Sequence, residues 1–130
     1  MNAAWKWLTA IVAAHLLISF AHGAAHDGAH VPLSTAANLF VFIVILGGPL
    51  AGLAVSWWNR RLGGGIILLT MAGSLVFGVV NHFLLESPDH VAHVDADWRV
   101  LFGSTAVLLA VTELLGVGLA MRVIRNGVRS

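Results

Sequence analysis

Three histidines recur every four residues in the segment HGAAHDGAH: His22, His26 and His30. A spacing of four residues places side chains on one face of a helix, where imidazoles can share a metal ion. Two glycines interrupt the segment, however, and glycine weakens a helix. We therefore expect a poor helix here, and a site that needs further ligands from elsewhere in the chain.

Those further ligands are found about 60 residues later, in NHFLLESPDHVAHVDAD. Histidines and carboxylates are again close together there, after a helical stretch that ends near a proline. We predict that the two segments form one metal site whose candidate ligands are His22, His26, His30, His82, Glu86, Asp89, His90 and His93. None of these spacings is a closed signature such as HExxH, so a solvated, weakly ordered loop is the alternative interpretation.

The ligand types restrict the metal. The chain has no cysteine, which excludes thiolate sites and disulfides. Imidazole and carboxylate suit zinc, copper(II), iron or nickel better than copper(I), and we expect copper or zinc. The paired Glu-x-x-His motifs of di-iron proteins are missing. Haem b, held by histidines such as His15, His22 and His82, is a less favoured cofactor.

The composition is that of an integral membrane protein. Of the 130 residues, 58% are hydrophobic and only 10% are charged, and the mean hydropathy is +0.89. About a quarter of the residues in a soluble domain are charged, so these charges are too few to cover a soluble surface. A lipid bilayer is therefore the expected surrounding. With a formal net charge of +1, nucleic acid is not an expected partner.

Four runs are long and apolar enough to provide the roughly 20 helical residues that cross a bilayer. We predict a single domain, residues 1–130, with spans at about 5–21, 34–56, 65–85 and 98–121. The predicted fold class is all-α: an integral membrane four-helix bundle with up-down-up-down topology. The first run also resembles a signal peptide, because Lys6 precedes its apolar centre. We expect it to be retained, since His15 in its middle is uncommon in a cleaved signal.

The basic residues indicate the orientation. One side of the four-span arrangement holds Lys6, Arg60, Arg61, Arg122, Arg125 and Arg129, and only Arg99 falls on the other side. By the positive-inside rule, the first side is cytoplasmic and contains both termini. We therefore expect a multi-pass protein of the cytoplasmic (inner) membrane, with its histidine-rich loops outside.

Two ionisable residues, His15 and Glu113, lie well inside the apolar runs. Each is nine residues from a basic anchor, Lys6 or Arg122, which is about 13 Å along a helix at 1.5 Å per residue. The first and last helices of an up-down bundle are neighbours, so the two side chains can meet at one depth. We predict an intramembrane polar pair or a proton relay that leads toward His22. A purely structural clamp is the alternative.

Small residues predict where the helices approach closely, because lipid provides no hydrophobic drive for helix association. Gly48 and Gly52 form a GxxxG pair in the second run. Ser74 and Gly78 lie on a small-residue face of the third run, and Gly103 lies on one in the fourth.

Three functions fit these features. The leading hypothesis is a binding protein that holds copper or zinc at its outer face, either alone or for a larger membrane partner. The alternatives are an accessory subunit of a respiratory or transport complex without a metal of its own, and a b-type haem or quinone redox carrier. Enzymatic activity is not expected, because no serine is recognisably paired with a base. Four helices provide little room for a pathway, so a homo-oligomer or a larger complex is expected.

Overall fold

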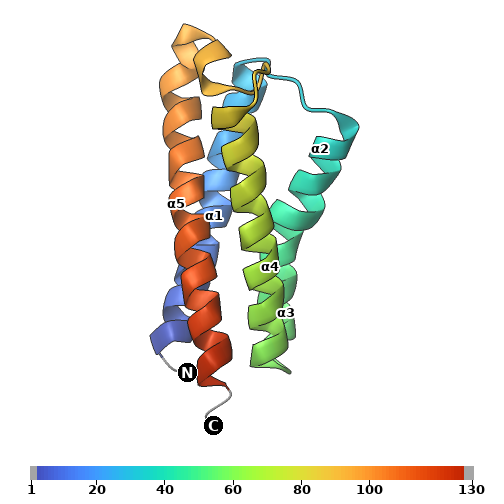
Figure 1. The fold of residues 1–130 in the computed structure, drawn as a ribbon, viewed down its shortest axis with the longest axis vertical. Coiled ribbons are helices and arrows are strands. Elements are labelled where there is room, and N and C mark those ends of the chain that lie inside the picture. Colours follow the sequence, from blue (N-terminus) through green and yellow to red (C-terminus); the bar gives the residue numbers. More distant parts are fainter. Residues whose placement is uncertain (1–2, 128–130) are drawn as a thin grey trace.

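The structure is a computed structural model that describes residues 3–127 as helices joined by short loops (Figure 1). The elements in chain order are α1 (Ala3–Gly28), α2 (Thr35–Phe40), the π-helical segment η1 (Val41–Gly47), α3 (Gly48–Val55), α4 (Arg60–Val79), the π-helical segment η2 (Val80–Leu84), the 3-10 turn η3 (Val91–His93) and α5 (Ala96–Asn126). No strand occurs among the described residues. The predicted all-α fold class is confirmed.

Four helical stretches in residues 3–127 are long and apolar enough to cross a membrane: Ala3–Gly28, Thr35–Val55, Arg60–Leu84 and Ala96–Asn126. Successive stretches run in opposite directions, and α1 begins at the end of the bundle where α5 finishes (Figure 1). We call this the terminal end. The opposite end, which holds residues 29–34 and 85–95, is the loop end. The side of the membrane that each end faces remains a prediction.

The first helix is longer than expected, because α1 continues through both glycines to Gly28. A side chain at Gly23 would meet nothing within 4 Å, whereas Gly28 lies against the ring of Trp98. Packing of α1 on α5 thus outweighs the cost of glycine in a helix, about 1 kcal/mol per residue. The chain leaves the helix at His30, whose φ of 54° is left-handed.

Side-chain caps explain why the third and fourth helices begin before the predicted boundaries. The side chain of Asn59 accepts a hydrogen bond of 3.0 Å from the backbone N–H of Leu62 at the start of α4. Asp95 accepts one of 3.0 Å from the N–H of Asp97 at the start of α5. Both residue types are favoured at this position because they satisfy free helix N–H groups.

The helices do not form a closed ring. α5 packs against both α1 and α4, as predicted for the first and last spans, and α3 packs against α4. α1 contacts the second span far less than it contacts α5. Toward the loop end, α2 leans away from α1 (Figure 1). The first and second spans are therefore separated at the loop end.

The apolar core occupies the terminal half of the bundle. Its fully buried members are Leu8 and Val12 from α1 with Ile67 and Met71 from α4. A smaller apolar cluster at the loop end contains Phe102, which is also fully buried. Large hydrophobic side chains elsewhere are exposed on the outer faces of the helices, as contact with lipid tails requires.

The GxxxG pair lies at the contact between α3 and α4. A side chain at Gly48 would collide with Thr70. A Cβ atom at Gly52 would lie 2.5 Å from Cγ1 of Ile67 and 2.9 Å from the carbonyl oxygen of Gly63. The two backbones approach this closely only because both positions lack side chains.

The other small residues differ in their surroundings. Ser74 is fully buried, and a Cβ at Gly103 would lie 3.2 Å from Cγ1 of Val91. Gly78 has no such close neighbour, because the nearest atom to its Cβ position belongs to His82 of its own span, at 3.9 Å.

We predict that Gly52→Ala destabilises the protein by about 1–3 kcal/mol, because its Cβ meets backbone atoms that have no room to move. Thermal unfolding of the purified protein in detergent measures this. Gly65→Ala is the matched control, since a Cβ there meets nothing within 4 Å. Equal melting temperatures for the two variants would contradict the close α3–α4 contact.

Candidate metal centre

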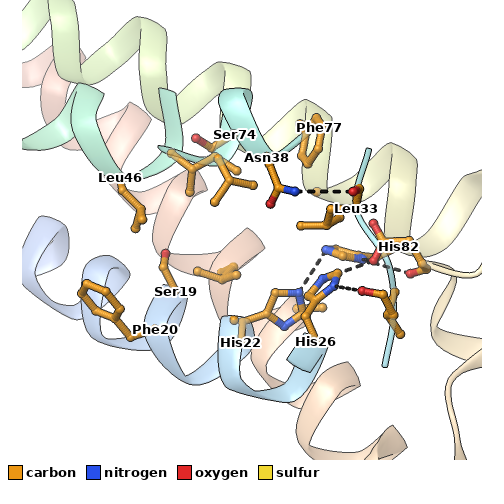
Figure 2. A pocket seen from close by; sticks show the side chains of 18 of the residues that line it. Ser19, Phe20, His22, His26, Leu33, Asn38, Leu46, Ser74, Phe77 and His82 are labelled. Atoms are coloured by element: carbon orange, nitrogen blue, oxygen red, sulfur yellow. Dashed lines mark hydrogen bonds and ion pairs between the residues drawn. The ribbon is translucent and has the colours of Figure 1, made fainter. Parts of the chain in front are cut away.

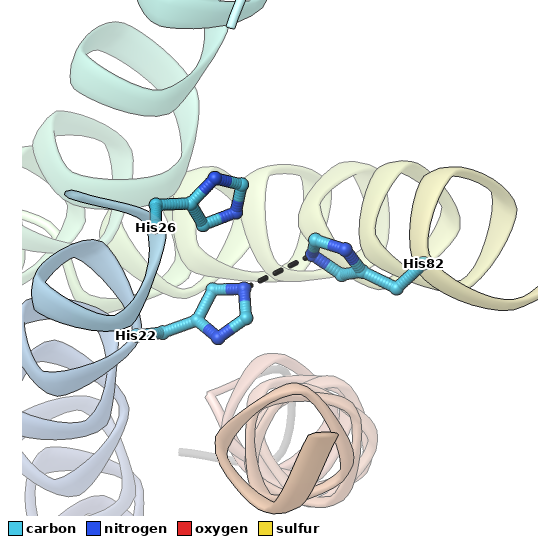
Figure 3. Close-up of side chains that lie close together, drawn as sticks. All are labelled: His22, His26 and His82. Carbon is cyan, nitrogen blue, oxygen red and sulfur yellow. Dashed lines mark hydrogen bonds between the residues drawn. The ribbon is translucent and has the colours of Figure 1, made fainter. Parts of the chain in front are cut away.

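Three histidines meet at the loop end of the bundle (Figure 3). His22 and His26 lie one turn apart on α1, and His82 lies in η2 at the end of the third span. Each offers a ring nitrogen, and these nitrogens all lie within 4.8 Å of one another. The continuity of α1 makes this arrangement possible, because a helix brings residues four apart next to each other on one face. We call these three residues the histidine cluster.

The hydroxyl of Thr105 determines the tautomer of His22. Thr105 Oγ1 donates its proton to the backbone carbonyl of Leu101 over 2.6 Å, and the same oxygen lies 2.8 Å from Nδ1 of His22. A hydroxyl has only one proton to donate, so it must accept from the imidazole. Nδ1 of His22 therefore carries a proton, and in the neutral ring Nε2 is an unprotonated lone pair.

Backbone carbonyls, which only accept hydrogen bonds, determine the tautomers of the other two rings. Nδ1 of His82 donates to the carbonyl of Asp89 over 3.1 Å. Nδ1 of His26 donates to the carbonyl of Val31 over a longer distance of 3.5 Å. In their neutral forms, these rings also leave Nε2 unprotonated.

The unprotonated nitrogens therefore converge. The Nε2 atoms of His22 and His82 are 3.1 Å apart, and Nε2 of His26 is 3.2 Å from Oδ1 of Asp89. Lone pairs this close repel each other unless a cation, either a proton or a metal ion, lies among them. Histidines that bind metal through one nitrogen usually donate the other N–H to a protein oxygen. The histidine cluster has this arrangement at all three rings.

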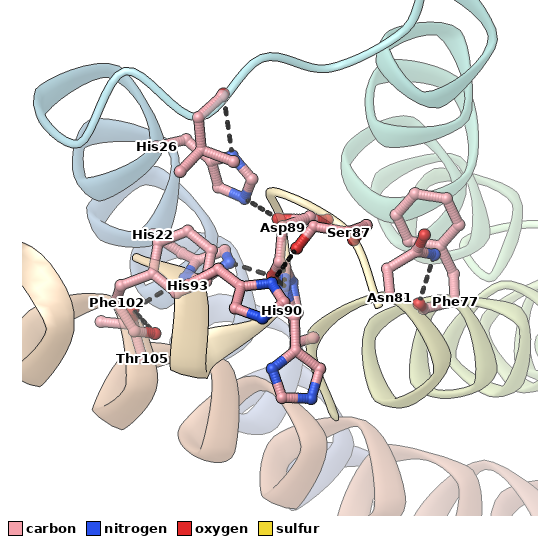
Figure 4. A network of polar contacts seen from close by, with 12 residues as sticks. His22, His26, Phe77, Asn81, Ser87, Asp89, His90, His93, Phe102 and Thr105 are labelled. Carbon is pink, nitrogen blue, oxygen red and sulfur yellow. Dashed lines mark hydrogen bonds and ion pairs between the residues drawn. The ribbon is translucent and has the colours of Figure 1, made fainter. Parts of the chain in front are cut away.

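Asp89 closes one side of the cluster (Figure 4). It is buried, and its Oδ1 lies 3.2 Å from both Nε2 of His26 and Nδ1 of His82. Neither contact has hydrogen-bond alignment, so this oxygen is unsatisfied among the described residues. Burial tends to raise the pKa of Asp89, but the neighbouring histidines, His82 above all, outweigh it and hold the pKa below 3.8. Asp89 is therefore a carboxylate at neutral pH.

Phe102 forms the apolar wall behind the histidines. Its fully buried ring lies with its centroid 4.7 Å from that of His22, 4.8 Å from that of His26 and 5.3 Å from that of His82. The ring excludes water from this side and restricts the three imidazoles. No pattern in the sequence indicated that Phe102 or Thr105 would lie at the site.

The other four predicted ligands lie outside this cluster. His30 is at the end of α1, where the chain turns away. Glu86, His90 and His93 belong to a loop at the surface, where Nε2 of His93 is 3.2 Å from Oε2 of Glu86. Nδ1 of His93 is 2.8 Å from the carbonyl of Ser87 (Figure 4). The structure thus brings together His22, His26, His82 and Asp89 and separates them from the rest.

A cavity of about 790 Å³ begins at the histidine cluster and extends into the bundle between α1 and the second span (Figure 2). The side chains of Ser19, Asn38 and Ser74 line it together with apolar residues. Its lining also includes Glu113, whose Oε1 lies 3.8 Å from Nδ1 of His15. The structure therefore brings the two intramembrane residues together at the inner part of this cavity.

Comparison with known proteins finds no family model, no curated protein and no solved structure that matches this chain. The function is therefore inferred from the chemistry of the site and from the membrane character of the helices.

We predict that Thr105→Val destabilises the protein by about 1–3 kcal/mol, because it removes the hydroxyl acceptor that lies 2.8 Å from the buried Nδ1–H of His22. Thr112→Val is the matched control. Thr112 is equally buried on α5, and its hydroxyl bonds carbonyls of its own helix. Denaturant unfolding compares the two, and equal losses would show that His22 does not depend on Thr105.

Proposed function

We propose that this protein is a small membrane protein that binds a divalent transition metal ion through His22, His26 and His82. One observation carries the proposal: the Nε2 atoms of His22 and His82 face each other with a ring nitrogen of His26 within 4.8 Å, while every Nδ1 is held by an oxygen outside the cluster. This arrangement supports a preorganised site, because the ring orientations and tautomers that metal ligation requires are already present.

The donor set favours zinc or copper(II). Tetrahedral ligands on bonds of about 2.0–2.1 Å lie roughly 3.3 Å apart, and the separation of the His22 and His82 nitrogens is 3.1 Å. Three imidazoles leave one position of a tetrahedron free. A water molecule from the adjoining cavity can fill it. Sites with three protein ligands and one exchangeable position are typical of zinc that binds further molecules.

A b-type haem is less well supported. The porphyrin has to lie between two axial imidazoles, and the facing nitrogens of His22 and His82 are only 3.1 Å apart. Phe102 and His26 also pack against both rings. A single ion fits among these side chains without separating the helices.

We expect the purified protein to bind one Zn²⁺ or Cu²⁺ per chain in calorimetric titrations. His26→Ala and His82→Ala each remove a ligand, so each should lower the affinity by more than the 10–100-fold typical of residues that only support a ligand, that is, by over about 100-fold.

His90→Ala and His93→Ala are the controls, since both rings lie outside the cluster. Circular dichroism establishes that each variant is folded. Wild-type affinity in the His26 and His82 variants, or an equal loss in the His90 variant, would refute the proposed site.

Metal occupancy should fall as the pH drops below about 6.5, because protons compete with the metal for the imidazole nitrogens. The sign follows from the linkage: a metal ion requires unprotonated Nε2 atoms, so acid favours the metal-free form. Titrations between about pH 8 and pH 5 against a chelator of known proton affinity test this. An affinity that stays constant over this range and is also unchanged in His26→Ala and His82→Ala would indicate ligands other than imidazole.

A further inference from the structure

The cavity leads from the histidine cluster to a second polar site in the middle of the bundle. His15 is fully buried and Glu113 is 3% exposed, and they come from the adjacent helices α1 and α5. Metal binding at the loop end requires neither residue, and among the described residues neither makes a hydrogen bond or ion pair with the histidine cluster. Their role has to be found in the contacts that they make with each other and with the second span.

The backbone of the second span holds His15 in one orientation. Pro49 has no N–H group, so the carbonyl four residues before it, that of Ile45, lacks its α-helical donor. Nε2 of His15 lies 3.2 Å from this carbonyl oxygen and donates to it. Nδ1 of His15 then points toward Glu113.

His15 and Glu113 can form a neutral hydrogen-bonded pair only if they share one proton. Nδ1 of His15 has no hydrogen-bond partner among the described residues and lies 3.8 Å from Oε1 of Glu113. An ionised carboxylate facing an unprotonated nitrogen would be an unpaired buried charge, which is costly. One proton, on either the carboxyl or Nδ1, makes the pair neutral, and a second would make it cationic. A small side-chain movement or one water molecule closes the remaining gap.

Few other charges act on this pair. From α5 only Glu113 faces His15, the second span has no ionisable residue, and α4 presents Ser74 and Met71 at this level. The remaining ionisable groups that line the cavity lie toward the loop end and are His22, His26, Asp27, His30, His82 and Asp89. Among the described residues, no lysine or arginine lines the cavity to neutralise Glu113.

The cavity provides access from the loop end. At about 30 Å³ per molecule, its volume of about 790 Å³ holds on the order of 20 water molecules. Ser19, Asn38 and Ser74 supply polar partners for water along the way (Figure 2). Hydrogen-bonded water in this cavity would connect the loop end with Glu113.

The terminal end is sealed. One turn beyond Glu113 on α5, Gly116 accommodates the side chain of Met71, whose Cε would lie 2.5 Å from a Cβ at that position. Leu8, Val12 and Ile67 are fully buried around the same level. These buried side chains fill the described core between Glu113 and the terminal end.

We propose that the cavity is a proton half-channel, in which His15 and Glu113 bind one exchangeable proton that enters and leaves only at the loop end. The ligand of this second site is the proton itself. The half-channel goes beyond metal binding and does not depend on it, because the pair lies apart from the metal ligands.

Infrared spectroscopy of the metal-free, full-length protein in lipid bilayers tests the proposal. At neutral pH we expect a carbonyl band from a protonated carboxyl group that is lost in Glu113→Gln and retained in the control Asp27→Asn. His15→Gln should keep the band but shift it, because the hydrogen-bond partner of the carboxyl changes. This variant keeps the test decisive if Glu113→Gln does not fold.

Exchange into D₂O tests the access route. In the wild type, the carboxyl band should shift as fast as exposed groups exchange. Ala110→Leu fills the cavity one turn from Glu113 and should slow this exchange several-fold. Val111→Leu is the control, since Val111 is exposed on the outer face.

Two results overturn the half-channel: an ionised Glu113 beside an unprotonated Nδ1 of His15 at neutral pH, or a pair whose proton exchanges as slowly in wild type as in Ala110→Leu, as it would if lipid chains filled the cavity. An imidazolium band from His15 in place of the carboxyl band would still support one shared proton. Both results are independent of the metal titrations, so either proposal can fail while the other stands.

Discussion

A buried imidazole has two ring nitrogens that need partners, and in an apolar bundle protein groups, a bound ion or trapped water must supply them. This constraint organises the loop end. The Nδ1 atoms of the three clustered histidines contact oxygen atoms of Thr105, Asp89 and Val31. Each ring also offers a nitrogen that lies within 4.8 Å of those of the other two. The same constraint operates at His15, where a backbone carbonyl takes one nitrogen and a carboxyl group faces the other.

The irregular backbone of the second span contacts His15, and the same span lines the cavity between the two polar sites. A π-helical segment followed by Pro49 leaves the carbonyl of Ile45 free for His15. At the loop end this span leans away from α1, so the bundle is open there and contains a cavity rather than a packed core (Figure 1). At the terminal end, Gly48 and Gly52 keep it close to α4. The second span therefore packs closely against α4 in the terminal half of the bundle and borders the cavity in the loop half.

Much of the fold was predictable because the bilayer restricts the choices. Apolar runs of sufficient length predict the four helices, and depth relative to Lys6 and Arg122 predicts that His15 and Glu113 lie near each other. Helix ends were predicted less well. Gly23 and Gly28 appeared to break α1, yet packing on α5 continues the helix through both, and this brings His22 and His26 onto one face. The candidate ligands also include residues that the structure places apart from the histidine cluster, since composition does not distinguish His26 from His30 or His90.

The sequence by itself determined the membrane character, the number of spans and the residue types available for chemistry, because these follow from hydropathy and side-chain identity. Only the tertiary structure decided which histidines converge, which tautomers they adopt and where the cavity lies. These properties depend on contacts between residues far apart in the chain, such as His22 with His82 and Thr105. Such contacts follow from how the helices pack, and packing leaves no periodic signal in a single sequence.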